Sequence, residues 1–214
     1  MSFSPIEFTL DFAIQSYWHI GSGLEGGAYA DALVLKSADD LPYIPGKSIK
    51  GLLKEAFMQA NDNHWFAASS CPDLVSLLFG TEGQAGDKTQ GILQISSGTL
   101  SAAECEFFAQ NPSAKINLFK VSYATAIDEE TGVAKETSFR SLEVVVPMCL
   151  SASISLNTRH PEYTKSDNSI GEHMALWLSQ VSTLITKLGA KRHRGLGQVR
   201  VTIKESQNTI AGGV

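Results

Sequence analysis

The residues best suited to chemistry in this sequence are basic side chains gathered near its C-terminal end. Residues 187–204 contain no acid and six cations: Lys187, Lys191, Arg192, Arg194, Arg200 and Lys204. The chain before residue 185 has eleven basic and 21 acidic residues, so a positive segment follows a strongly negative one. The arginines can fork onto phosphate oxygens, and we expect a polyanion site. A solvated turn with a charge run is the alternative that this segment leaves open.

Glycines accompany these cations. Gly189, Gly195 and Gly197 have no Cβ, so the backbone amides of this loop would be able to approach a ligand closely. A sugar-phosphate backbone is a ligand of that kind. The sequence therefore predicts a glycine-rich, phosphate-binding loop between a helix and the last strand.

A second candidate for phosphate binding is a helix start. Pro45-Gly46 bends the chain, and Lys47, Ser48 and Lys50 follow at the beginning of an apolar helical stripe. The free amides of a helix start attract anions, and these three side chains would add to that attraction. A capped helix with solvated lysines is the alternative.

Two familiar nucleotide motifs are incomplete. Gly46-Lys47-Ser48 resembles the end of a Walker motif, but Leu41 stands where the first glycine is required. Residues 21–26 fit G-x-G-x-x-G, yet a dinucleotide site needs a helix to begin there, and the chain soon runs into prolines instead. Because Leu41 replaces the first glycine of the Walker motif, a nucleotide triphosphatase loop is excluded. A phosphate- or dinucleotide-binding enzyme stays as one alternative function.

Length and composition are those of an ordinary globular protein. With 214 residues, 43% hydrophobic and 18% charged, the chain can bury one good core, so we expect a single domain over residues 1–214. No signal peptide and no apolar run of membrane-spanning length is evident, which predicts a cytoplasmic protein without a membrane partner. Cys71, Cys105 and Cys149 are odd in number and far apart, and the five histidines have no metal-ligand spacing. Reduced thiols, local hydrogen-bonding histidines and no transition metal are expected.

Hydrophobic periodicity predicts an α+β fold. The expected elements are a strand over 6–20, a helix from 47 capped by Ser48, a short helix over 73–79, a strand over 91–97, a helix over 101–110 with Ser101 and Glu104 as its capping box, a strand over 148–156, a helix over 171–188 ended by Gly189, and a strand over 198–204. Without the helices at 73–79 and 101–110, their order is ferredoxin-like (RRM-like): an antiparallel sheet with helices on one face.

A β-hairpin is inserted near the middle of that order, at about residues 118–147. Two apolar-rich arms, 119–127 and 138–146, flank the polar tip Asp128 to Gly132. Gly132 supplies the positive φ that a tight turn favours. A plain extension of the sheet is the alternative, although it leaves the apolar residues near the tip unexplained.

In these features the chain resembles the RAMP superfamily of CRISPR-associated proteins, and within it the backbone subunit of type III (Csm/Cmr-like) RNA-guided effector complexes. The resemblance spans nearly the whole chain and rests on His19 to Gly23, Leu41 to Gly51, Leu78 to Gly80, the hairpin Ala126 to Ala134 with Arg140 and Glu143, and Gly189 to Gly197. It implies a ferredoxin-like RAMP domain whose inserted hairpin acts as a thumb.

The resemblance also implies partners and contacts. Such subunits polymerise along a guide RNA (crRNA), and the partners expected here are that RNA, the target RNA, other copies of the chain or paralogous RAMP subunits, and the large and small effector subunits. The residues expected to hold RNA are Lys47, Ser48, Lys50, Lys191, Arg192, His193 and Arg194, with Ile127 and Val133 beside bases at the thumb tip and Arg140 on a phosphate.

For catalysis the resemblance points to Asp31. Family members cleave target RNA with Mg²⁺ through an aspartate in the loop after the first strand, and Asp31 has nearly that place. Its carboxylate would hold a hydrated Mg²⁺ or help deprotonate a ribose 2′-hydroxyl. Glu25 is a second candidate. The hydrophobic approach and the following proline of the family are missing here, so a turn hydrogen bond is the alternative role for Asp31.

Three functions follow from the sequence. The first is a crRNA-binding backbone subunit in antiviral defence that cleaves target RNA at regular intervals with Mg²⁺. The second is a non-catalytic RNA-binding scaffold of the same complex. The third is the phosphate- or dinucleotide-binding enzyme.

Overall fold

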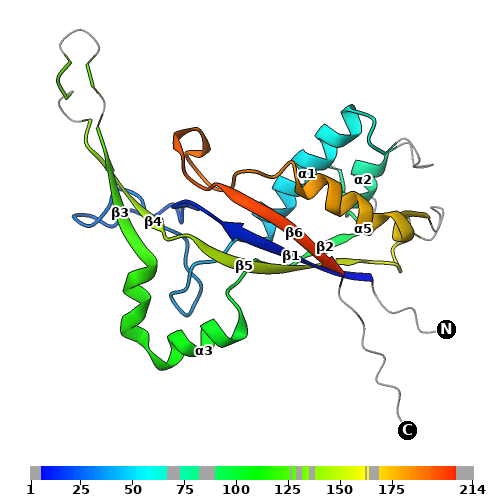
Figure 1. Ribbon diagram of the computed structural model, residues 1–214, viewed down its shortest axis with the longest axis horizontal. Helices are drawn as coiled ribbons and strands as arrows, with labels where there is room; N and C mark the ends of the chain where they lie inside the picture. Colours follow the sequence, from blue (N-terminus) through cyan, green and yellow to red (C-terminus); the bar gives the residue numbers. More distant parts are fainter. Residues whose placement is uncertain are drawn as a thin grey trace.

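A computed structural model describes residues 6–66, 73–81, 90–125, 127–128, 132–134, 138–161, 163 and 169–205. The regular elements are β1 (Ile6–Ile14), α1 (Gly46–Asp62), α2 (Leu74–Phe79), β2 (Leu93–Ile95), α3 (Ala102–Gln110), η2 (Pro112–Leu118), β3 (Phe119–Ala124), β4 (Arg140–Val145), β5 (Met148–Leu156), α5 (Ser169–Ser182), η3 (Arg192–Arg194) and β6 (Val199–Glu205). In Figure 1 the main sheet runs diagonally beneath α1 and α5.

The main sheet confirms the ferredoxin-like expectation. Its four strands lie in the order β2-β5-β1-β6 and all neighbours are antiparallel. Counted along the chain within this sheet, that order is second, third, first, fourth, with α1 and α5 as the two crossover helices. This is the ferredoxin-like arrangement, α+β with an antiparallel sheet.

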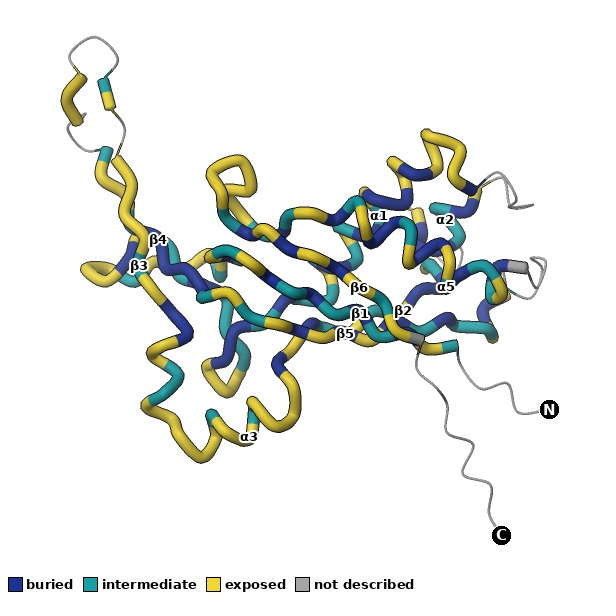
Figure 2. Tube along the Cα trace, in the orientation of Figure 1, coloured by how far each residue is buried: buried dark blue, intermediate teal, exposed yellow. Residues whose placement is uncertain are grey.

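Alternation along the strands separates a buried face from an open one. On β1, Phe8, Leu10, Phe12 and Ile14 are buried and the residues between them are partly exposed. Strand side chains alternate between faces, so the buried set points toward the two helices. The opposite face is polar, and Figure 2 shows the corresponding alternation of buried and exposed stretches along the sheet.

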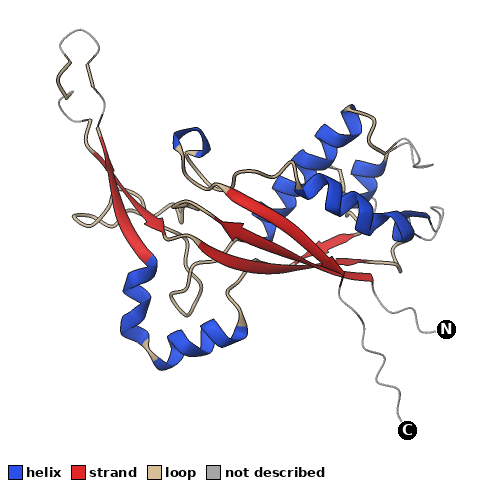
Figure 3. Ribbon diagram, viewed as in Figure 1, coloured by secondary structure: helices blue, strands red, loops and turns tan. Residues whose placement is uncertain are grey.

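The segment between β2 and β5 is the insertion. It comprises α3, η2 and the β3–β4 hairpin, which forms a separate two-stranded sheet and extends away from α1 and α5 (Figure 3). The capping box predicted for α3 is present, because Ser101 accepts from the Glu104 amide and Glu104 accepts from the Ser101 amide. The hairpin predicted at about residues 118–147 is also present, with β3 and β4 as its paired arms.

Three predicted elements end earlier than periodicity indicated, and one of them is the strand expected over 91–97, which spans only Leu93–Ile95. The first strand ends at Ile14, and beyond it the chain changes partner, because Trp18 forms a bridge with Val145 of β4. The long helix ends at Ser182 and does not reach residue 188, because the amide of Leu188 donates to Gly197 and that part of the chain pairs with the segment before β6.

Smaller predictions also meet their outcome here. Ser48 is not the cap of α1, whose N-cap position is Pro45 with no side-chain cap. Cys105 and Cys149 are free thiols, and Cys71 lies outside the described residues. His19 is a local hydrogen-bonder, as expected, since its Nδ1 lies 2.7 Å from the carbonyl oxygen of Glu143. Over the described part of the chain no helix is both long and apolar enough to cross a membrane.

Candidate nucleic-acid interface

The basic C-terminal loop presents its cations to solvent. Lys191 has a left-handed φ of 54° and opens the short helix η3, and Gly195 closes it with a φ of 82°. The Arg194 amide donates to the Lys191 carbonyl at 2.8 Å, so the loop is a compact turn. Lys191, Arg192, His193 and Arg194 are all exposed. Four basic or imidazole side chains are therefore available on one turn.

Two glycines of this loop serve packing within the protein. A Cβ on Gly189 would collide with the carbonyl oxygen of His19, and one on Gly197 would collide with that of Leu188. The neighbouring amides fasten the loop, since Ala190 donates to His19 and Gly197 to Tyr17. The expectation that these glycines admit a ligand is wrong for both. Only Gly195 among the three has open space around the Cβ position.

The loop lies against α1. Arg192 Nη1 is 3.8 Å from Glu55 Oε2, and the two elements line a common hollow to which α1 contributes Leu52, Glu55 and Gln59. Ser48 precedes these residues at the spacing of one helical face, four residues before Leu52 and seven before Glu55. Ser48 therefore lies on the flank of α1 that meets the basic loop.

The other predicted residues of this helix start are placed differently. At about 100° per residue, Lys50 projects about 160° away from Ser48, on the opposite flank of α1. The Gly46 amide donates to the Ser97 hydroxyl at 3.2 Å, and the Ser48 amide to the Pro45 carbonyl at 2.8 Å. Two backbone amides of the first turn are thus already hydrogen-bonded within the protein. The exposed side chain of Lys47 is the group of this turn that is best placed to bind an anion.

Asp31 joins the loop after β1 to the hairpin. Its Oδ2 accepts from the Ser141 amide at 2.7 Å, and its own amide donates to the Ser141 hydroxyl at 3.0 Å and to the Ser141 carbonyl at 3.1 Å. The backbone bond from Ser141 lowers the pKa of Asp31 most, and the charges of Arg140 and Lys191 lower it further. This carboxylate is therefore ionised at neutral pH and lies close to cations from two distant parts of the sequence.

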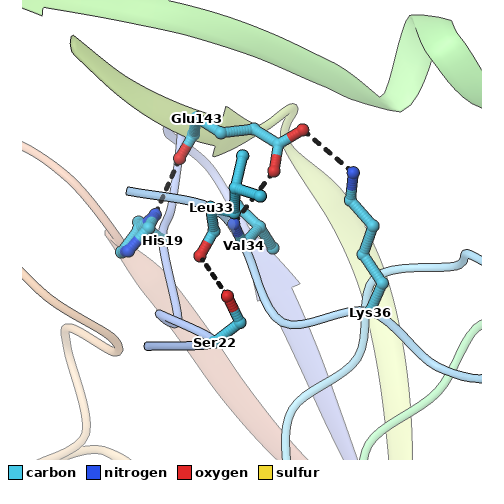
Figure 4. A network of polar contacts seen from close by, with 6 residues as sticks. All are labelled: His19, Ser22, Leu33, Val34, Lys36 and Glu143. Atoms are coloured by element: carbon cyan, nitrogen blue, oxygen red, sulfur yellow. Dashed lines mark hydrogen bonds and ion pairs between the residues drawn. The ribbon is translucent and has the colours of Figure 1, made fainter. Parts of the chain in front are cut away.

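A buried carboxylate holds the same loop from inside. Figure 4 shows Glu143 of β4 between two segments. On one, the Val34 amide donates to Oε2 at 2.9 Å and Lys36 Nζ pairs with Oε1 at 2.9 Å; on the other, His19 faces the backbone carbonyl of Glu143. Because a carbonyl oxygen only accepts, His19 carries its proton on Nδ1. The Glu143 side chain is 2% exposed. Glu143 thereby fixes the path of residues 32–36, which follow Asp31.

The described residues contain no group of three His, Cys, Asp or Glu that could hold an ion. Asp31 itself offers one carboxylate, and one of its oxygens is already bonded to Ser141. Mg²⁺ commonly takes one or two carboxylates and fills its remaining positions with phosphate oxygens and water. The donor set fits Mg²⁺ only in that sense, with RNA supplying other ligands.

The hairpin tip carries the two predicted apolar residues outward. Ile127 and Val133 are each 64% exposed, and Ile127 forms a bridge with Ala134 across the tip. The Gly132 φ of 68° confirms the expected positive value. Arg140 lies farther down the hairpin, exposed, at the start of β4.

The predicted residues therefore form three groups. The basic loop lies against the flank of α1 that carries Ser48; the charges of Arg140 and Lys191 act on Asp31; and Ile127 and Val133 lie at the hairpin tip. Lys47 and Lys50 belong to none of these groups. Tyr123 and Phe139, which stack on the hairpin, were not predicted as site residues, and Glu143 was predicted only as part of a motif. Aromatics at exposed positions of a strand were the available signal for the stacked pair.

The dinucleotide motif lacks its structural context. Residues 15–45, which include Gly21 to Gly26, contain no helix, and the first helix begins at Gly46. A pyrophosphate held at a helix start after the first strand is therefore not supported.

Comparison with known proteins gives a family and a fold. The family model of the RAMP superfamily matches residues 11–200. No curated protein matches the sequence. A chain of the cryo-EM structure of the Type III-B Cmr-beta bound to cognate target RNA is similar, with a TM-score of 0.64, 11% identity, and coverage of 92% of this chain and 96% of that one. A chain of Type III-B Cmr-beta in the apo state has a TM-score of 0.62, 9% identity, and coverage of 95% and 98%. At such identities the likeness shows the fold alone.

Proposed function

Because this chain belongs to the RAMP superfamily, we propose that it is a crRNA-binding backbone subunit of a type III CRISPR effector complex, acting in the cytoplasm in antiviral defence. The main observation behind the proposal is that the exposed cationic loop lies beside the flank of α1 that carries Ser48. The positive charge of Lys191, in the same loop, also acts on the carboxylate of Asp31. The fold it shares with a chain of a complex bound to target RNA supports RNA as the ligand.

The contacts would be with the RNA backbone. Exposed Lys47, Lys191, Arg192 and Arg194 suit phosphate oxygens, whose recognition is independent of sequence, while base pairing between guide and target reads the sequence. The acidic remainder of the chain would face the basic loops of neighbours, which we propose to be other copies or paralogous RAMP subunits, with the large and small effector subunits beyond them.

The binding test is the salt dependence of guide-RNA affinity. Replacing Arg192 and Arg194 by Ala should weaken binding and reduce the slope of log affinity against log salt by about 1.4, because each lost contact to single-stranded RNA contributes about 0.7. Lys115→Ala is the control, since it removes one partly exposed cation on η2, within the insertion, where its Nζ donates to the Asp39 carbonyl. An unchanged slope in the double variant, or an equal loss per charge in Lys115→Ala, would contradict the proposal.

We further propose that the assembled complex cleaves target RNA through Asp31. Its lowered pKa makes it a weak base at neutral pH, so an electrostatic or metal-holding role suits it better than proton abstraction. When bound, Mg²⁺ would stabilise charge on the scissile phosphate. The chain's own part is to keep the Asp31 carboxylate ionised and fixed by Ser141, beside the RNA path.

A non-catalytic scaffold is the second candidate. The hydrogen bonds between Asp31 and Ser141 favour it, because they are sufficient to give Asp31 a structural role without any catalysis. The assembled complex with labelled complementary RNA and Mg²⁺ separates the two. Asp31→Asn keeps an acceptor for the Ser141 amide but removes the charge, so it should abolish cleavage without weakening RNA binding. Cleavage at the wild-type rate in this variant would remove Asp31 from the chemistry. Glu25→Gln tests the other candidate acid.

A further inference from the structure

Two aromatic rings stack on the outside of the β3–β4 hairpin. The centroids of Tyr123 and Phe139 are 5.4 Å apart and their planes meet at 22°, so the rings are nearly parallel. Each residue is 63% exposed. Aromatic side chains gain most when they are buried, so a parallel pair left in solvent is a feature that folding does not require.

The surroundings of this pair are polar. Toward the hairpin tip Thr125 and Ser138 share a hydrogen bond at 2.8 Å, and toward the base Arg140 and Ser141 follow. A protein-docking surface is usually a contiguous apolar patch of several hundred Å². Two rings with hydroxyls nearby instead suit a flat, polar-edged ligand that adds to an existing stack.

The pair lies next to Asp31. Tyr123 is directly opposite Ser141 in the register of the hairpin, and both the amide and the carbonyl of Ser141 bond to Asp31. Because these backbone groups point away from β3, Tyr123 and Ser141 form a non-hydrogen-bonded pair, in which side chains are closest. Tyr29 lies in the loop that carries Asp31. Its pKa is raised mainly by burial, next by Glu143, and to a smaller extent by Tyr123.

We propose that the stacked rings of Tyr123 and Phe139 bind one nucleobase of an RNA strand whose backbone passes Arg140 and Asp31. This proposal rests on the proposed function and names a base-binding site that is separate from the apolar hairpin tip. The rings are already parallel, so the base adds a third layer without ordering new side chains. A stack on aromatic rings is tolerant of sequence, which suits a strand whose sequence is read by pairing.

The experiment uses the full chain assembled on RNA that carries 2-aminopurine, a base whose fluorescence falls when it stacks. In one arm the label is moved along a single-stranded guide RNA; in the other it is moved along a complementary strand added to the unlabelled guide complex. The variants are Tyr123→Ala with Phe139→Ala, and Tyr123→Leu with Phe139→Leu. The leucine variant keeps apolar bulk and removes the rings, and Tyr123→Phe is the matched control that keeps the ring.

We expect quenching at one repeated label position in wild type and Tyr123→Phe, and its loss in both the alanine and the leucine variants. Affinity for the strand that carries the base should fall by about 5-fold to about 150-fold in the alanine variant, the range for stacking one base. Replacing the quenched nucleotide by an abasic one should cancel the difference between wild type and variant. The arm that quenches identifies guide or target as the source of the base.

The opposing outcomes are separable. Salt-sensitive RNA binding without quenching that depends on the rings would overturn the base site and leave the proposed function standing. Full quenching in the leucine variant would also overturn it, as would a loss of self-association, measured by sedimentation, in place of a loss of RNA affinity. Failure of the wild-type chain to bind RNA would overturn the proposed function and this inference together.

Discussion

The carboxylate of Asp31 accepts a hydrogen bond from the backbone amide of Ser141, with 2.7 Å between Oδ2 and N. The two residues are 110 positions apart in sequence, so this bond connects the loop after β1 with the tip-side end of the β3–β4 ladder of the inserted hairpin. A displacement of β4 must therefore move Asp31 or break this bond. Any chemistry at Asp31 is coupled to the position of the hairpin.

Two substitutions separate the structural from the electrostatic role of Asp31. Asp31→Ala removes the acceptor, so the Ser141 amide loses its partner and the melting temperature should fall. Asp31→Asn offers an amide oxygen in the same place, so its melting temperature should stay nearer to wild type, while guide-RNA affinity rises because a negative charge near Arg140 and Lys191 is gone. Differential scanning fluorimetry and RNA titration give both values. Equal melting temperatures for the two variants would count against the structural role.

Part of this architecture follows from local sequence and part does not. Alternation on β1, the helical stripe of α1 and the capping box of α3 depend on near neighbours, and the sequence predicted them. The ends of β1 and α5 depend on pairing with distant segments: Trp18 with Val145, and Leu188 with Gly197. Buried apolar residues recur beyond both points, Trp18 after β1 and Leu188 after α5, and so periodicity could not locate the change of direction.

The candidate site shows the same division. The basic loop could be found from composition because charge density is a local property. The packing role of Gly189 and the burial of Glu143 could not, because both depend on which backbone lies alongside. Tyr123 and Phe139 are 16 positions apart, and only the register of the hairpin makes them neighbours.

Glu143 should be the most sensitive charged residue of the chain. Glu143→Ala leaves Lys36 without its ion partner and the buried Val34 amide without an acceptor, so we expect the free energy of unfolding to fall by about 3 kcal/mol, at the low end for a buried pair because Lys36 is 31% exposed. Glu143→Gln keeps an acceptor and should cost less. Urea unfolding measures both.

A matched control for this change is Glu55→Gln. Glu55 also pairs with a cation, Arg192, but at 3.8 Å and with 72% of its side chain exposed. Such a pair contributes little, so the free energy of unfolding should change by less than about 0.5 kcal/mol. If Glu143→Ala were as mild as Glu55→Gln, the buried network would not hold the loop.

Two glycines of the basic loop distinguish strain from collision. Gly195 and Gly197 have φ values of 82° and 71°, so alanine is strained at either by about 1 kcal/mol or somewhat more. Only at Gly197 does the added Cβ also collide with a backbone carbonyl, that of Leu188. Gly197→Ala should therefore lower the free energy of unfolding by about 2 kcal/mol more than Gly195→Ala. If urea unfolding gave equal losses of free energy for the two variants, the loop would be able to move away from Leu188 without cost.

The open face of the sheet carries an ion pair whose pH dependence can be worked out. Asp11 Oδ2 lies 2.7 Å from Lys204 Nζ, and Asp11 Oδ1 accepts from the Ser151 hydroxyl at 2.7 Å. Hydrogen bonds from Lys204 and Ser151 lower the pKa of Asp11 below its ordinary 3.8, and the bond to Asp11 raises the pKa of Lys204 above 10.5. The stabilisation from Asp11 is present above pH 3.8 and is lost as the pH falls through its lower folded pKa.

The contribution of Lys204 has the opposite sign. It is present below pH 10.5 and is lost as the pH rises through the raised folded pKa. The difference in melting temperature between wild type and Asp11→Asn should therefore be level between about pH 5 and pH 9, shrink toward both extremes, and diminish in high salt because the pair is exposed. Ser151→Ala is the control. It should raise the pH at which the contribution of Asp11 is lost on acidification and leave unchanged the pH at which that of Lys204 is lost. A difference that persists at pH 2 would show that Asp11 stabilises the sheet by something other than its charge.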